Sequence, residues 1–335
     1  MTLELSYYIF MMLFSYITVL YTKFFKLYVL FAIIFLILIR NVGFDTDILH
    51  FIDLMKQDFY SIFIYREFAF WLTGRYLYHL TNNEVITYIG LDLLWFTILL
   101  FSFKKYRNKI FTRRLFIVFF VSFPFVLGIE NLYRQHIGLV FTISAYLLRE
   151  DKPKYALFLY FISIFMHNSM VMFFPLIIFK HFYNINFKFR FFISNTVLFI
   201  MLFGIYLVKS GILSEIGKSS ADTGLDLRFL YLSVFLSVLY LFSIKFRFSI
   251  TKFLKTFPSV YFAIIIVAFM MQFDGTAPVE RLAMGYLLLF TIDFFIYIEN
   301  KKNINKYKKL IYLLYAICFS LPSLLFSSVR NFLLT

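Results

Sequence analysis

Long continuous apolar runs constrain this chain more than any other feature of its sequence. They recur from one end to the other, each roughly 12 to 20 residues long, with short polar stretches between them. Continuous runs, rather than alternating residues, indicate helices and disfavour an outer-membrane barrel. Only 15% of the 335 residues are charged, and 62% are hydrophobic. A soluble domain of this length needs more polar surface, so we predict an all-α polytopic membrane protein.

The polar breaks divide the chain into twelve candidate membrane spans. Several are shorter than the ~20 residues that usually cross a bilayer, so flanking polar residues are expected to extend the helices. No internal repeat or separate soluble domain is visible, and residues 1–335 are therefore expected to form a single transmembrane domain. The spans are expected near 3–22, 27–39, 85–103, 115–129, 137–148, 155–166, 170–179, 191–208, 229–244, 256–273, 282–298 and 310–328.

Basic residues are concentrated in alternate connections between these spans. Six connections hold 23 of the 33 Lys and Arg residues and only three acids. The positive-inside rule places such connections in the cytoplasm and therefore puts both termini outside the cell membrane. This distribution explains the net charge of +15 as topology, and we expect no nucleic-acid partner. The six connections are 23–26, 104–114, 149–154, 180–190, 245–255 and 299–309.

The connections on the predicted outer side mix acids, arginines, histidines and aromatic residues. The longest, 40–84, contains "RNVGFDTDILHFIDL" and "YREFAFWLTGRYLYHL", which suggest short amphipathic helices at the membrane interface. The connection near 130 contains "ENLYRQH", the turn at 165–170 is "FMHNSM", and residues 274–281 read "DGTAPVER". Four of the five histidines fall on this side, which favours it as the location of chemistry.

Arg134, Gln135 and His136 stand where a span begins. Unpaired N–H groups and partial positive charge at a helix N-terminus suit an anion, and an arginine adds planar donors that match phosphate. Arg40 and Arg281 are expected to approach the same outer face from other helices, with Glu280 beside Arg281. We therefore predict a site for a lipid-linked phosphate or diphosphate at membrane level.

Catalytic candidates on the outer side are His167, Asp45 and Glu67. A histidine titrates near neutral pH, which favours His167 as the base. Ser169 follows two residues later, but this spacing alone is a weak signal of nucleophilic catalysis, because an orienting acid is not evident. There is no metal-ligand motif and no nucleotide-binding motif, so neither a metal nor another cofactor is expected.

The ordered outer motifs resemble the EpsG-like membrane proteins, which belong with the Wzy-type polymerases of bacterial O-antigen, capsule and exopolysaccharide. The resemblance rests on "RNVGFD" at 40–45, "YRQHIGLVF" at 133–141, "FMHNS" at 165–169 and "ERLAMGYLL" at 280–288. It covers most of the chain in order. Residues 182–273 carry little of it, and the additional histidine in "YRQH" maps to no family role.

The resemblance implies a GT-C-like glycosyltransferase in the bacterial inner membrane, with its active site facing the periplasm. Its substrate would be an undecaprenyl-diphosphate-linked oligosaccharide. The growing glycan would pass from the diphosphate to the non-reducing end of another lipid-linked repeat unit, and no nucleotide sugar would be needed. Arg40, Arg134 and Arg281 would stabilise the leaving diphosphate. Sugar identity, linkage and binding of a chain-length regulator stay open.

Three other functions are compatible with the sequence. A single-sugar membrane glycosyltransferase would look much the same. An acyltransferase with a cytoplasmic donor would need polar residues through the bilayer, where Asp92 and Asp293 are the obvious charged candidates. A flippase for lipid-linked oligosaccharide would also use charges within spans. The one-sided polar clusters and the scarcity of glycine, 11 in all, favour chemistry at one face.

Overall fold

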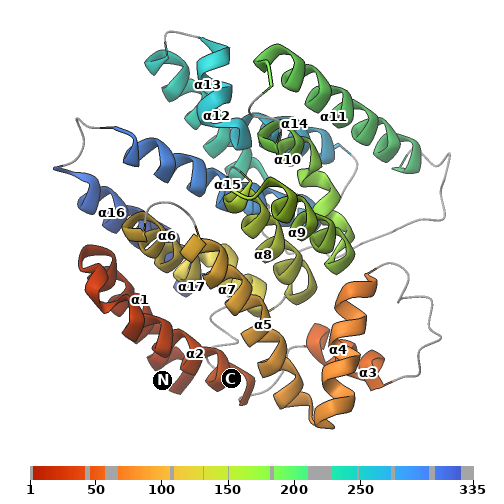
Figure 1. Cartoon of the computed structure of the whole chain (residues 1–335), viewed down its shortest axis with the longest axis vertical. Coiled ribbons are helices and arrows are strands. Elements are labelled where there is room, and N and C mark those ends of the chain that lie inside the picture. The colour runs from red at the N-terminus through yellow and green to blue at the C-terminus, as the bar shows by residue number, and fades with distance from the viewer. Residues whose placement is uncertain are drawn as a thin grey trace. The chain divides into compact units, whose positions relative to one another are not determined.

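The protein is described by a computed structural model in which all regular elements of the described residues are helices (Figure 1). The all-α prediction is therefore confirmed. Compact packing divides the chain into two units, Met1–Met170 with Ile298–Thr335 and Val171–Tyr297. The structure describes residues 3–41, 46–56, 67–105, 109–130, 132–149, 151–181, 185–209, 228–246, 249–272, 276–301 and 306–325.

The first unit is built around two groups of packed helices. α1 lies against α2, α6 and α16, and α8 lies between α5 and α9. The short α3 and α4 precede α5 and pack on each other, and α4 also contacts α9. The helices of this unit are α1 (Leu3–Leu20), η1 (Thr22–Phe24), α2 (Phe25–Asn41), α3 (Thr46–Lys56), α4 (Phe68–Thr81), α5 (Glu84–Lys105), α6 (Lys109–Val121), α7 (Phe123–Glu130), α8 (Tyr133–Leu148), α9 (Pro153–Met166), α16 (Lys308–Ser320) and α17 (Pro322–Leu325).

The second unit contains a buried ion pair at a sharply bent helix pair. Lys180 Nζ lies 3.2 Å from Asp293 Oδ1, and the Ser259 hydroxyl donates to Asp293 Oδ2 over 2.6 Å. Ser259 follows Pro258, where the chain turns by 96° between α13 and α14. The elements here are η3 (Asn168–Phe173, shared with the first unit), α10 (Phe174–His181), α11 (Phe187–Lys209), α12 (Arg228–Lys245), α13 (Ile250–Thr256), α14 (Pro258–Met270) and most of α15 (Thr276–Glu299).

Five helices of the described chain are long and apolar enough to cross a membrane. They are α1, the run Thr22–Asn41, α5, α11 and α15, and two bent helix pairs raise the count to seven if each is one span. Every one of the twelve predicted spans overlaps a helix. Breaks such as the 58° bend between α6 and α7, however, leave several of these helices too short to cross a membrane alone. The fold is compatible with a polytopic membrane protein, and twelve crossings stay a prediction.

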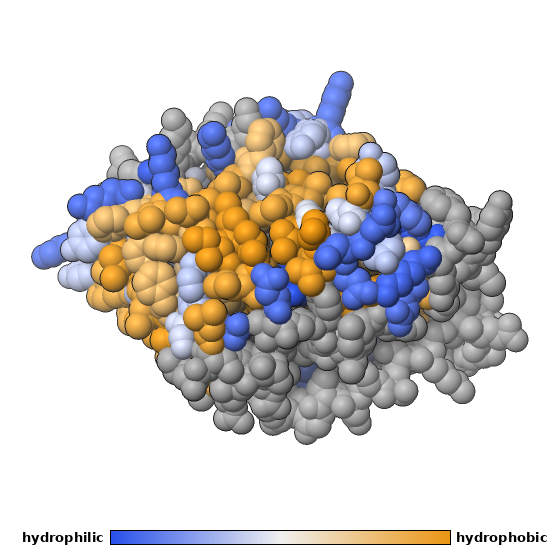
Figure 2. Space-filling view, turned by 90° about the horizontal axis from the view of Figure 1, so that it is seen from below, coloured by the Kyte–Doolittle hydropathy of each residue, from blue (hydrophilic) through white to orange (hydrophobic). Residues whose placement is uncertain are grey.

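Apolar side chains cover much of the described surface. On the face in Figure 2, hydrophobic residues form a broad field with hydrophilic residues at its edges. α11 is one helix with exposed apolar side chains, since Phe199 is 70% exposed and Ile200 is 64% exposed. Surface of this kind is costly in water and is suited to lipid.

The described residues of the connection at 40–84 include two short helices, and their predicted position at the membrane interface stays a prediction. α3 and α4 pack through aromatic rings, with Phe51 edge-on to Trp71 at 6.0 Å between ring centroids. Arg75 of α4 donates to the Leu54 carbonyl oxygen over 3.1 Å, which ties the two helices together. These helices place Glu67, Phe51 and Trp71 near the start of α8, as the contacts of Arg134 show.

Candidate functional site

A fully buried ion pair joins α2 to α5 in the first unit. Arg40 Nε lies 2.7 Å from Asp92 Oδ2, and Arg40 Nη2 lies 3.2 Å from Asp92 Oδ1. Neither side chain has any exposed surface. A bidentate guanidinium–carboxylate pair is the geometry in which two buried charges compensate each other best.

Further groups complete this pair. The Trp95 indole N–H and the Tyr133 hydroxyl donate to Asp92 Oδ1 over 2.9 and 2.8 Å, and Arg40 Nη2 donates to the Ile129 carbonyl oxygen over 3.1 Å. The Tyr133 ring lies 4.9 Å from the Arg40 guanidinium carbon. Arg40 is therefore committed to holding α2, α5 and the start of α8 together. Because its side chain has no exposed surface, we assign Arg40 no substrate contact.

His136 also lies inside the helix core. Its ring is edge-on to Trp95 at 4.8 Å and to Phe125 at 4.4 Å between centroids, and only 2% of the residue is exposed. Gly128 of α7 lies so close that a methyl group there would collide with the imidazole. His136 therefore packs the α7–α8 corner, and its ring is enclosed by neighbouring side chains. Gln135 is buried as well.

A second polar cluster remains accessible at the ends of three helices. We call it the Glu67 cluster and define it as Glu67, Arg134, His167 and Ser169. Glu67 directly precedes α4, Arg134 is in the first turn of α8, and the other two follow the end of α9. Arg134 Nη1 forms a short ion pair with Glu67 Oε2, and His167 Nε2 lies 3.5 Å from Glu67 Oε1. The Arg134 side chain is 28% exposed and that of His167 is 22% exposed, so a substrate can reach both.

Close backbone approach fixes the position of His167. α9 ends at Met166, and His167 has extended backbone with its N–H donating to the Ser163 carbonyl oxygen over 3.0 Å. A methyl group on Gly138 would lie 3.2 Å from His167 Cβ and 2.9 Å from Met170 Cγ. Glycine at this point of α8 therefore lets the turn that carries His167 lie directly on the helix.

The hydrogen bonds of His167 define its tautomer. The Ser169 backbone N–H points at Nδ1 over 3.2 Å and can only donate, so Nδ1 accepts. The Ser169 hydroxyl oxygen lies 2.7 Å from the same nitrogen. In the neutral ring the proton is then on Nε2, which faces the Glu67 carboxylate. This is the arrangement of a base whose protonated form a carboxylate stabilises.

Arg134 retains donors for an anion. A guanidinium carries five N–H donors, and within the described residues Arg134 donates only to Glu67. The guanidinium carbon lies 4.3 Å from the Phe51 ring centroid and 5.6 Å from the Trp71 ring, which hold the group in place. The first backbone hydrogen bond of α8 runs from His136 N to Leu132 O, so the N–H groups before it are outside the helical ladder. The start of α8 is suited to bind phosphate oxygens.

Three predicted site residues remain, Asp45, Glu280 and Arg281. Asp45 is outside the described residues. Glu280, which is buried, and Arg281, which is half-buried, are on α15 in the second unit. The sequence placed Ser169 beside His167 but did not identify Glu67 as the acid that faces this histidine, because residues 67 and 167 meet only through tertiary packing. In the part of the chain that the structure describes, no group of three His, Cys, Asp or Glu side chains is arranged to hold a metal ion.

Comparison with protein-family models, with curated protein sequences and with solved structures finds no match to this chain.

Proposed function

We propose that the protein is a polymerase of lipid-linked glycans that works at the outer face of the bacterial inner membrane. The observation that carries the proposal is the Glu67 cluster. It combines an accessible histidine base, a carboxylate oriented on that histidine, and an arginine with open donors, beside Phe51 and Trp71. All four residues fall in connections with few basic residues, which the positive-inside rule assigns to the outside.

The proposed reaction assigns one role to each group. The acceptor sugar hydroxyl gives its proton to His167 Nδ1, in the position that the Ser169 hydroxyl now occupies. The alkoxide oxygen bonds to the anomeric carbon of the donor glycan, and the bond from that carbon to the undecaprenyl diphosphate oxygen breaks. Arg134 stabilises the negative charge on the leaving diphosphate. Glu67 stabilises the imidazolium, because a carboxylate already paired with a guanidinium is itself a poor proton acceptor.

The proposal includes a topology. Twelve crossings with both termini outside would place the Glu67 cluster at the periplasmic membrane face, where a lipid-linked repeat unit presents its diphosphate. The exposed apolar surface of the helices supports contact with lipid. The resemblance to EpsG-like and Wzy-type polymerases supports the same orientation and the same substrate class.

A reconstituted assay tests the function directly. The purified chain is placed in proteoliposomes with an undecaprenyl-diphosphate-linked repeat unit, and products are separated on a gel. We expect a ladder of polymer lengths without added nucleotide sugar. A single added sugar would indicate a single-sugar transferase. Movement of the substrate across the bilayer without any ladder would indicate a flippase.

Arg134→Ala is expected to abolish the ladder. Truncation removes the phosphate donors and unpairs Glu67, and loss of one such electrostatic group commonly lowers kcat by about 10²- to 10³-fold. Arg134→Lys is the matched control, because it keeps the charge but loses the planar fork, and we expect it to retain intermediate activity. The rate of repeat addition is measured in variants with equal membrane insertion. Normal polymer lengths from Arg134→Ala would remove its role in phosphate binding.

Acyl transfer is a second candidate, favoured by one observation. Glu67, His167 and Ser169 form a continuous chain of an acid, a base and a hydroxyl, with 3.5 and 2.7 Å between their facing atoms. Such a chain can activate a serine nucleophile. In either reaction the Ser169 N–H, which donates to Nδ1 over 3.2 Å, has to move off that nitrogen before the nitrogen accepts a proton.

Ser169→Ala separates the two candidates. In the polymerase the serine hydroxyl only occupies the place of the acceptor, so we expect the rate of repeat addition to stay within about threefold of that of the parent protein, the size of one lost hydrogen bond. In an acyltransferase the same change removes the nucleophile, and labelling of the protein by a fluorophosphonate would disappear with it. Labelling of the parent at Ser169, together with an inactive Ser169→Ala variant, would replace the polymerase proposal.

A further inference from the structure

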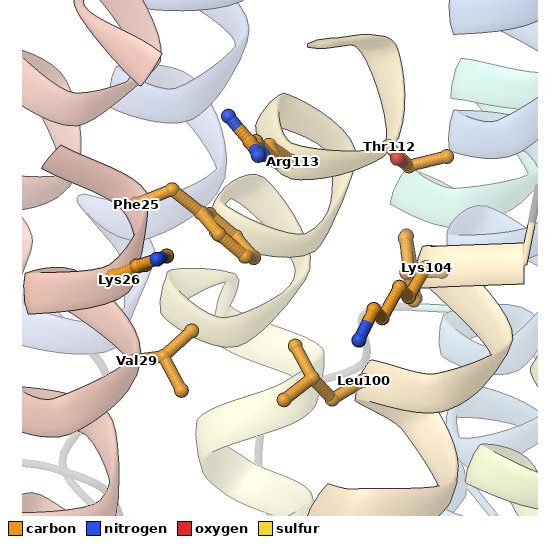
Figure 3. Close-up of a pocket in the computed structure, with 8 residues that line it drawn as sticks. Phe25, Lys26, Val29, Leu100, Lys104, Thr112 and Arg113 are labelled. Atoms are coloured by element: carbon orange, nitrogen blue, oxygen red, sulfur yellow. The ribbon is translucent and has the colours of Figure 1, made fainter. Parts of the chain in front are cut away.

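A cavity of about 350 Å³ lies in the first unit between α2, α5 and α6 (Figure 3). Three of its lining residues are cations, Lys26, Lys104 and Arg113, one on each helix. In Figure 3, Lys26 and Lys104 approach the cavity from opposite sides, and Arg113 lies on the third helix. Lys26 and Lys104 are exposed, so the cavity opens to the surface at its charged end.

The positive charge of this cavity is uncompensated within the described chain. No carboxylate of a described residue forms an ion pair with any of the three cations. Elsewhere in the same unit Lys308 is paired with Glu299 over 3.3 Å. Three cations facing one space without an acid favour an anionic occupant.

The other wall of the cavity is apolar. Val29, Leu100 and Phe103 line it. Val29 and Leu100 lie about one helical turn further into α2 and α5 than the lysines do, since Lys26 is near the start of α2 and Lys104 near the end of α5. Both helices are candidate membrane spans, so in a membrane the cations would lie near the boundary with water and the apolar wall would lie below them. A molecule that fills this space has a negative head and a hydrocarbon chain.

We propose that this cavity binds an anionic phospholipid, with the headgroup phosphate on the three cations and an acyl chain on the apolar wall. Basic pockets between membrane helices recognise headgroups in this way. A free phosphate ion would satisfy the cations and leave the apolar wall uncovered. The site lies on the basic connections 23–26 and 104–114, and it shares no residue with the Glu67 cluster, so it does not depend on the proposed function.

Native mass spectrometry of the full-length chain in detergent tests the proposal. Phosphatidylglycerol and phosphatidylcholine with identical acyl chains are titrated separately. We expect phosphatidylglycerol to bind at a defined stoichiometry and phosphatidylcholine at least tenfold more weakly. In the triple variant Lys26→Gln, Lys104→Gln, Arg113→Gln, we expect phosphatidylglycerol to bind about a hundredfold more weakly, from a roughly fivefold contribution for each charge.

The matched control removes three cations outside the cavity. Lys152→Gln, Lys154→Gln and Lys252→Gln change exposed residues at the start of α9 and in α13, where no lining residue of the cavity lies. We expect this variant to bind phosphatidylglycerol as the parent does. Equal losses in the two triple variants would show attraction by net charge alone and would overturn the site.

Two further outcomes would also overturn it. Unchanged binding in the cavity variant would place the lipid elsewhere. Displacement of phosphatidylglycerol by millimolar inorganic phosphate would show a phosphate site in which the apolar wall contributes nothing. Equal melting temperatures of the parent and the cavity variant in the absence of anionic lipid establish that the variant is folded, so its loss of binding reports on the cavity itself.

Discussion

Replacing His167 with alanine is expected to lower the rate of repeat addition by about 10²- to 10⁴-fold, the usual contribution of a general base. Within the Glu67 cluster, the proposed base is His167 Nδ1. This nitrogen faces Ser169, whereas Nε2 of the same ring faces the Glu67 carboxylate. The turn that carries the residue is held by its backbone N–H and by contact with Gly138, neither of which needs the imidazole. We therefore expect the fold to survive.

The measurement is the rate of polymer extension in proteoliposomes with matched protein content. His79→Ala is the control, because His79 is an exposed histidine on α4 and lies outside the Glu67 cluster. We expect its rate to stay within about twofold of that of the parent, as is usual for an exposed residue away from a functional site. Equal rates for both variants would withdraw His167 as the base. A rate lost in Glu67→Gln but retained in His167→Ala would transfer that role to Glu67.

Asp92→Ala is expected to lower the free energy of unfolding by about 3–5 kcal/mol, the cost of breaking a buried ion pair on one side. The change leaves the Arg40 guanidinium uncompensated in a site with no exposed surface, and it also removes the acceptor of Trp95 and Tyr133. The measurement is unfolding in mixed micelles with increasing denaturing detergent.

Two further variants show that the loss comes from the unpaired charge. Arg40→Met combined with Asp92→Leu removes both charges and keeps the volume, so we expect it to recover much of the stability that Asp92→Ala loses. Asp53→Ala is the surface control, because Asp53 is 72% exposed and 3.9 Å from Lys56. An exposed pair is worth under about 1 kcal/mol. If the double variant were no more stable than Asp92→Ala, the loss in the free energy of unfolding would come mainly from altered packing and not from the unpaired buried charge.

The apolar runs predicted where helices form, because a continuous apolar segment that is buried satisfies its backbone hydrogen bonds within itself as a helix. Each predicted range contains helix. Where a helix bends depends on local packing that an apolar run does not encode. Phe123 follows a break in one predicted span, and Pro258 begins α14 after a 96° turn, and hydropathy alone predicted neither bend.

For the site, the sequence predicted the chemical types of the residues but not their partners, and the side of the membrane stays a prediction. Both Arg40 and Arg134 were predicted to bind the diphosphate. Their environments differ because Asp92 of α5 captures the first, and a carboxylate inside an apolar run was the one signal that pointed to a buried partner. Glu67 meets Arg134 and His167 through the packing of α4 against α9 and the start of α8, which no spacing in the sequence reveals.

The Arg40–Asp92 pair has a consequence for how the chain enters the membrane. Asp92 lies 52 residues after Arg40, so a ribosome that adds about 5–20 residues per second completes the partner about 3–10 seconds after the arginine emerges. An unpaired charge at the centre of a span costs about 2.5–3.5 kcal/mol, whereas Arg40 is in the last turn of α2, from where its side chain can reach the headgroups. The end of α2 is therefore retained near the headgroups until α5 arrives, and the two helices become a stable unit only together. We therefore expect membrane insertion of α2 and α5 to be cooperative.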